Sequence, residues 1–103
     1  YNQTGITVST SPVVVDTFDK NMYRAAKYIA SSHDTSSTKF EVTEILVVHD
    51  GTTAVLSEYG KLATSNLVIT YTTTISGNSV QLLATGVSGS ANSVKVMPTY
   101  ITV

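Results

Sequence analysis

The sequence predicts an all-β fold, an antiparallel β-sandwich or jelly-roll-like domain of about seven to eight short strands. Three observations lead to this prediction. Val, Ile and Thr, which suit a pleated strand, fill more than a third of the 103 positions. Two stretches rich in these residues each fold back at a Gly-containing turn signal. Only 13% of the residues are charged, about half of the usual share for a soluble domain.

Residues 39–49 and 53–59 predict the first hairpin. The first stretch alternates at its start and is fully apolar from Ile45 to Val48, which predicts a strand that begins half exposed and ends buried on both faces. Asp50-Gly51 suits a tight type I′ turn, in which both central residues have positive φ, and Gly60 ends the returning strand. The expected register pairs Val48 with Thr53, Leu46 with Val55, Glu44 with Ser57, Ile45 with Leu56 and Val47 with Ala54.

A second hairpin is predicted over residues 67–75 and 80–85, with Gly77-Asn78 at the turn. One face is expected to pack on the core and the other, rich in Thr, to face water. The expected core face contains Ile69, Tyr71, Thr73, Ile75, Val80, Leu82 and Ala84. Residues 86–92 have the composition of a loop. A last strand over 93–103 is expected to lie at an edge or bulge near Pro98, which cannot donate a backbone hydrogen bond.

The first third of the chain is ambiguous. Short strands are predicted at 7–9 and 13–15, on either side of Pro12. Over residues 16–31 the apolar side chains recur at a spacing that slightly favours a helix, while the alternation from 23 to 29 also fits a strand. The hydroxyl-rich stretch 31–38 predicts a surface loop. We therefore expect an extended N-terminal arm over 1–12 and a single β-sandwich domain over 13–103.

Three phrases carry a resemblance to a known family. They are Tyr23-Arg24-x-Ala26-Lys27-Tyr28 after Phe18, the run from Glu44 to Ala54 (EILVVHDGTTA), and Ser57-Glu58-Tyr59-Gly60. In this order they resemble a β-rich module of virion structural proteins from tailed bacteriophages of the marine and cyanophage type. The similarity extends from about residue 13 to the C-terminus. It implies a strand over 23–28 and a virion component, and it brings no catalytic residues with it.

Composition excludes several classes of function. The formal net charge is −1 with six Lys and Arg, so no basic stripe is available for nucleic acid. No apolar run reaches the length of about 18 residues that predicts a membrane-spanning helix. Without cysteine there is neither a disulfide framework nor a cysteine-ligated metal. We expect no cofactor.

The His-Asp pairs at His49-Asp50 and His33-Asp34 are candidate metal ligands. His49-Asp50 lies at a predicted turn and His33-Asp34 in a predicted loop, so turn formation is the favoured interpretation and no metal site is predicted.

Three glutamates, Glu41, Glu44 and Glu58, are candidate general acids or bases. The favoured interpretation is structural ion pairing, with Arg24 or Lys27 as the partner of Glu44. No Gly-x-Ser-x-Gly or Ser-x-x-Lys motif occurs, and we expect no enzyme activity.

Two further features are weak binding signals. The six tyrosines (1, 23, 28, 59, 71 and 100) are expected mainly in the core and its rim, with a sugar-binding platform as the alternative. Asn2-Gln3-Thr4 matches the glycosylation pattern, which arises often by chance.

The predicted function is that of a virion structural protein: a tail fibre, baseplate or neck, or capsid-surface domain. It would act by self-association and contacts with other virion proteins, because few charges have to be desolvated when such a surface is buried. The N-terminal arm and the strand around Pro98 are expected contact elements. Two alternatives stay open, a module that binds carbohydrate or the host surface at a fibre tip, and a subunit of a cellular extracellular filament.

Overall fold

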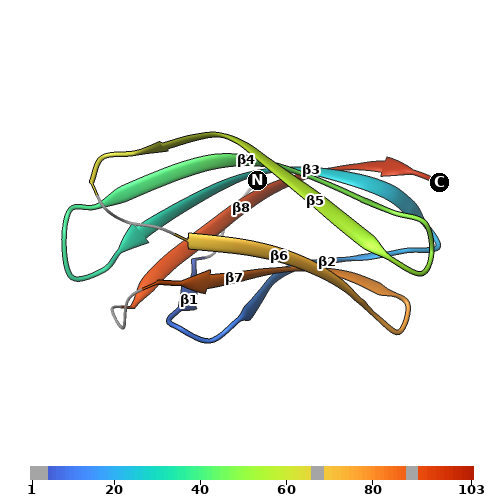
Figure 1. The fold of residues 1–103 in the computed structure, drawn as a ribbon, viewed down its shortest axis with the longest axis horizontal. Helices are drawn as coiled ribbons and strands as arrows, with labels where there is room; N and C mark the ends of the chain where they lie inside the picture. The colour runs from blue at the N-terminus through green and yellow to red at the C-terminus, as the bar shows by residue number, and fades with distance from the viewer. Residues whose placement is uncertain (1–4, 66–68, 88–90) are drawn as a thin grey trace.

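The computed structural model describes residues 5–65, 69–87 and 91–103. Over these residues the chain forms eight antiparallel strands in two sheets, which confirms the predicted β-sandwich. A five-stranded sheet in the order β1-β8-β3-β4-β5 packs against a three-stranded sheet in the order β2-β7-β6 (Figure 1). None of the described segments is a helix long and apolar enough to cross a membrane. The strands are β1 (Ile6–Val8), β2 (Val13–Asp19), β3 (Tyr23–Asp34), β4 (Phe40–His49), β5 (Ala54–Ala63), β6 (Ile69–Ser76), β7 (Ser79–Gly86) and β8 (Asn92–Thr102).

The core lies between the sheets because each strand turns alternate side chains inward. Its largest fully buried side chains are Tyr28, Ile45, Ile69 and Leu82. Smaller or slightly less buried apolar side chains complete it: Val8, Val15, Phe18, Ala26, Ala30, Val47, Tyr71, Val80, Ala84 and Val94.

A polar clamp joins the two sheets through this core. Asp16, on β2, accepts hydrogen bonds at Oδ2 from the hydroxyls of Tyr28 on β3 (2.8 Å) and Tyr100 on β8 (2.6 Å). Burial raises the pKa of Tyr28, and the charge of Asp16 raises it further. Both sheets are thus held by one carboxylate, in addition to apolar packing.

The second hairpin has the predicted register. Ser76 pairs with Ser79 and Ile75 with Val80, and Gly77 alone of the two turn residues has a positive φ, 60°. Glycine at the first central position is the signature of a type II′ turn. The predicted core face of β6 and β7 does turn inward. Residues 67 and 68, predicted as the start of this hairpin, lie outside the described residues.

The first hairpin has the predicted faces in a different register. β4 and β5 pair Val48 with Val55 and Leu46 with Ser57, two residues away from the predicted pairing. A shift of two leaves every side chain on its predicted face, because side chains alternate with a period of two.

The turn between β4 and β5 explains the shift. The carboxylate of Asp50 accepts the backbone N–H groups of Thr52 and Thr53 at 2.9 and 2.8 Å, and its own N–H donates to the Thr53 carbonyl. The connection therefore takes four residues. Only Gly51 has a positive φ, 94°, so the predicted type I′ turn is wrong.

β5 also continues beyond its predicted end. Gly60, with a φ of 66°, lies in a bulge opposite β4, and pairing resumes as far as Ala63. Glu58 lies before this bulge and pairs with Ile45 in the register set by the turn; the predicted register would have placed it opposite Thr43.

β3 resolves the ambiguity in the first third of the chain in favour of a strand. Lys27 pairs with Leu46 on one side and Thr99 on the other, so β3 lies in the middle of the larger sheet. The strand also continues through Asp34, which corrects the predicted start of the loop at residue 31. Ser32 and Asp34 turn inward and are buried there.

The N-terminal segment contributes β1, which pairs with residues 92–94 of β8. Val8 is fully buried in the core. The pairing of β1 with β8 stops at Val94 and does not reach Pro98, which pairs with Tyr28 of β3. On the side of β8 turned away from β3, no described strand therefore lies beside Pro98, which fits a residue that has no backbone N–H to donate. The Asn2-Gln3-Thr4 pattern lies outside the described residues.

Candidate functional site

His49 is a structural residue at the end of β4. The backbone N–H of Gly51 donates to its Nδ1 at 2.9 Å, which assigns the proton to Nε2. Nε2 then donates to the carbonyl of Tyr23 at 2.7 Å. Both ring nitrogens are thus used by the backbone, and Arg24 Nη1 donates to the carbonyl of His49 at 3.1 Å. The buried imidazole fastens the β4–β5 turn to the start of β3.

The second His-Asp pair also builds a turn. The Asp34 carboxylate accepts the backbone N–H (3.0 Å) and hydroxyl (2.8 Å) of Ser36, and these bonds lower the pKa of Asp34. His33 stacks on Phe40 with ring centroids 4.5 Å apart. Since His33 pairs with Phe40, it lies nine positions along β4 from His49, roughly 30 Å. Among the described residues no group of three or more His, Asp or Glu could hold a metal ion.

Glu41 and Glu58 meet at one lysine. Glu41, whose side chain is 1% exposed, lies 3.3 Å from Lys61 Nζ, and Glu58 lies 3.6 Å from the same atom. Lys61 also donates to the carbonyl of Ile69, and the backbone N–H of Ile69 donates to Glu41 at 3.4 Å. Burial raises the pKa of the nearby Tyr71, and the charges of Glu41 and Glu58 raise it further. The Lys61–Glu41 ion pair joins β5 to β4, and the two hydrogen bonds with the Ile69 backbone join both strands to β6.

Glu44 faces the other way from this cluster. Its partner is Lys27, one of the two predicted cations, with 3.7 Å between Lys27 Nζ and Glu44 Oε1. Both side chains are well exposed. Glu44 and His49 are five positions apart on β4 and so lie on opposite sides of the sheet.

The tyrosines are mostly internal. Tyr28 and Tyr71 are buried, and Tyr23 stacks on Tyr100 with ring centroids 5.0 Å apart. The prediction of core and rim packing is confirmed for these four. Of the described tyrosines only Tyr59 is exposed. A flat platform of several aromatic rings is therefore not formed by this part of the chain. Tyr1 lies outside the described residues.

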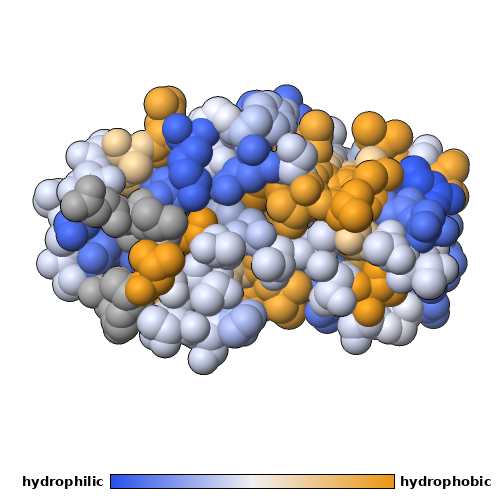
Figure 2. Space-filling model, in the orientation of Figure 1, coloured by the Kyte–Doolittle hydropathy of each residue, from blue (hydrophilic) through white to orange (hydrophobic). Residues whose placement is uncertain are grey.

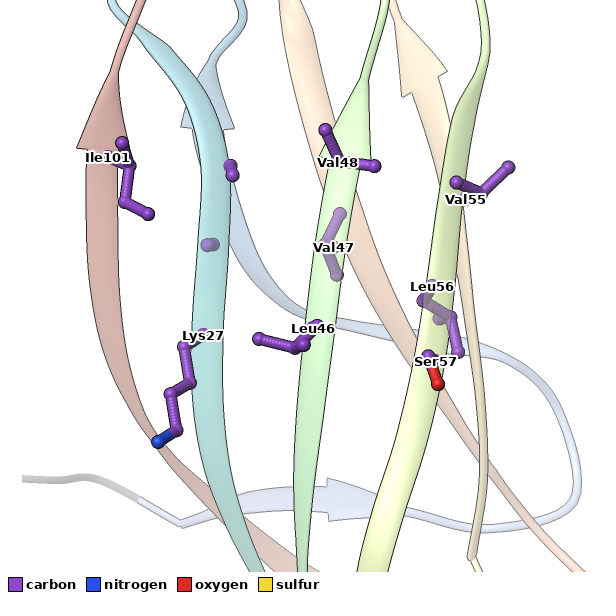
Figure 3. A pocket seen from close by; sticks show the side chains of 10 residues that line it. Lys27, Leu46, Val47, Val48, Val55, Leu56, Ser57 and Ile101 are labelled. Atoms are coloured by element: carbon purple, nitrogen blue, oxygen red, sulfur yellow. The ribbon is translucent and has the colours of Figure 1, made fainter.

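The most unusual surface is the outer face of the larger sheet, which we define as the side turned away from β2, β7 and β6. Leu46 and Val48 of β4 are 47% and 45% exposed there, and Val55 and Ile101 are 58% and 61% exposed. In Figure 3 these side chains lie over a shallow apolar hollow that crosses β8, β3, β4 and β5. Figure 2 shows hydrophobic surface in the right half of the view, where β5 begins after the β4–β5 turn.

This face is what sequence reasoning missed. The apolar run Ile45–Val48 was predicted to be buried on both faces, but β4 buries only Ile45 and Val47 of the run and exposes Leu46 and Val48. The unbroken apolar run already indicated that both faces of β4 are apolar. No described element of this chain covers the outer one of these two faces.

The fold and surface define a β-sandwich module with one apolar sheet face. No family model and no curated protein matches the sequence. A solved structure is similar: the tailspike protein of Acinetobacter phage vB_ApiP_P1 has the same fold over 99% of this chain, with a TM-score of 0.57 and 20% identity. The match takes up 22% of the tailspike chain, so this chain spans about a fifth of the protein it matches.

Proposed function

We propose that the chain is a structural module of a bacteriophage virion, in a tail component, and that it acts through protein–protein contacts. The single observation that carries the proposal is the tailspike match over nearly the whole chain. The resemblance of the sequence to virion proteins of marine and cyanobacterial phages points to the same class.

The surface supports an assembly role. The outer face exposes Leu46, Val48, Val55 and Ile101 together, and contiguous apolar patches of this kind mark interaction sites. Partners of the module are further copies of itself and other virion proteins, and its location is the particle. The prediction that it is not an enzyme is kept as part of the proposal.

The test uses purified phage particles that carry the gene. Antibodies against the chain are applied as gold-labelled probes, and the particles are also analysed by cryo-electron microscopy. We expect labelling and matching density at the tail. Absence of the protein from particles, or its presence in filaments on uninfected host cells, would refute the proposal.

A glycan array with the isolated chain tests the remaining alternative. Binding that is abolished by Tyr59→Ala would assign the chain to a fibre-tip carbohydrate module, because Tyr59 supplies the exposed aromatic ring. Under our proposal the array gives no signal.

A further inference from the structure

The outer face has a regular geometry that the strand pairing defines. Ala25 of β3 lies opposite Val48, Lys27 opposite Leu46, and Ile29 opposite Glu44. On the flanks, β8 adds Ile101 beside Ala25 and Met97 beside Ile29, and β5 adds Val55 beside Val48 and Tyr59 beside Glu44.

Two opposite charges lie at the centre of this apolar surface. Lys27 and Glu44 occupy one diagonal of a four-residue cell, while Ile29 and Leu46 occupy the other. In Figure 3, Lys27 and Leu46 extend from the adjacent strands β3 and β4 on the viewer's side. The cell therefore has a charged diagonal and an apolar diagonal, which cross at its centre.

This arrangement is complementary to itself. A second copy related by a two-fold axis along the apolar diagonal would place Ile29 and Leu46 against their own equivalents. The same rotation brings the Lys27 of each copy to the Glu44 of the other. The two lysines and two glutamates then form an alternating square, in which each cation lies between two anions.

We propose that a second copy of this chain packs its outer face on this one in the crossed, two-fold arrangement just described. The inference rests on the proposed function and names its contact surface and partner. With strands ~4.8 Å apart and ~6.8 Å for two residues along a strand, the diagonal lies roughly 35° from the strands. The sheets of the two copies then cross at about 70°, nearer to the orthogonal class of sheet packing than to the aligned one.

The size of the surface sets the strength of the contact. Four strands and four rows of side chains outline roughly 500 Å² of sheet on each copy, and about 400 Å² of this overlaps when the two sheets cross at about 70°. The two copies together would bury about 800 Å², the size of a weak, transient contact. We therefore expect a reversible dimer with a dissociation constant of about 10–100 µM.

Charge reversal separates this dimer from other modes of association. Lys27→Glu and Glu44→Lys each put like charges opposite one another across the axis, twice in every homodimer. Both positions are well exposed in the single chain, so the variants are expected to fold, which circular dichroism checks. Sedimentation equilibrium should show at least about a tenfold weaker dimer for each variant, because like charges then face each other twice across the interface.

The decisive measurement is an equimolar mixture of the two variants. In a heterodimer, the introduced glutamate of one chain meets the introduced lysine of the other, and the unchanged Glu44 of the first meets the unchanged Lys27 of the second. The mixture should therefore regain dimers of wild-type strength, which also shows that both variants are folded. As a matched control, Thr72→Lys and Thr72→Glu introduce the same charged side chains on the outer face of the smaller sheet, where Thr72 is exposed, and should leave association unchanged.

Each result decides the matter. Variants that associate as tightly as the wild type, a wild-type chain that stays monomeric to about 1 mM, well above the expected dissociation constant, or a threefold species would overturn the crossed dimer. If the chain is still found in particles in those cases, the proposed function survives. A dimer with restored association in the mixture but no chain in particles would uphold the interface and refute the proposed function.

Discussion

Removal of the Asp16 carboxylate should lower the free energy of unfolding more than removal of Asp19, the other charged side chain of β2. Asp16→Ala takes the acceptor from the hydroxyls of Tyr28 and Tyr100, which lie 2.8 and 2.6 Å away. Hydrogen bonds to a charged group contribute about 1.5–3 kcal/mol each, so we expect a loss of about 3–6 kcal/mol in the free energy of unfolding for the two. That is a large part of the roughly 5–15 kcal/mol that stabilises a small domain.

Urea unfolding followed by circular dichroism measures this loss. Asp19→Ala is the matched control, because Asp19 is on the same strand and its carboxylate accepts the exposed backbone N–H of Asn21; it should cost about 1 kcal/mol or less. Asp16→Ala combined with Tyr28→Phe should cost less than the sum of the two changes, by about 1–2 kcal/mol. A loss for Asp16→Ala no larger than for Asp19→Ala would refute the clamp between the sheets.

Three further perturbations test other parts of the fold. Because the pKa of Tyr28 and of Tyr71 is raised in the folded chain, their contribution to the free energy of unfolding is complete below about pH 10 and declines above it, by up to ~1.4 kcal/mol per pH unit for each tyrosine. Urea unfolding between about pH 9 and pH 11 should show this decline, and the Tyr28→Phe and Tyr71→Phe variants should show a smaller one. Backbone hydrogen bonds from Thr53 and Thr52 lower the pKa of Asp50, so the contribution of Asp50 to the free energy of unfolding is present above about pH 4 and is lost as the pH falls further. Asp50→Ala should make stability depend less on pH in this acid range, and an unchanged dependence would contradict the hydrogen bonds assigned to the turn. Gly86→Ala would place a Cβ 2.7 Å from the carbonyl oxygen of Ser9 and should cost about 1–3 kcal/mol by thermal unfolding.

The two hairpins show what local sequence signals can predict. In the second hairpin the alternation and the Gly77-Asn78 turn both indicate the same register, and the structure has it. In the first, the turn signal was misleading. The Asp50 carboxylate binds two backbone N–H groups and so builds a four-residue turn, a side-chain effect that the Asp-Gly dipeptide does not reveal.

Secondary structure over the first third depended on tertiary context. Met22 and Ile29 fit a helical apolar stripe, yet both are exposed in the structure, while Ala26 and Tyr28 turn inward as in a strand. Neighbours far away in sequence decide this, because β3 pairs with β4 on one side and with β8 on the other. Periodicity within the segment carries no information about such partners.

The apolar run of β4 likewise depends on partners that the sequence does not name, here at the level of assembly. Ile45 and Val47 find their cover in the smaller sheet, but Leu46 and Val48 find none in the described part of the chain. A run without alternation indicates that both faces need cover, and it does not indicate what supplies it. In the crossed dimer that we propose, Leu46 meets its own equivalent and the centre of the outer face leaves water. The pattern that mispredicts the single chain would then describe the assembly, and the paired charges of Lys27 and Glu44 would select its geometry.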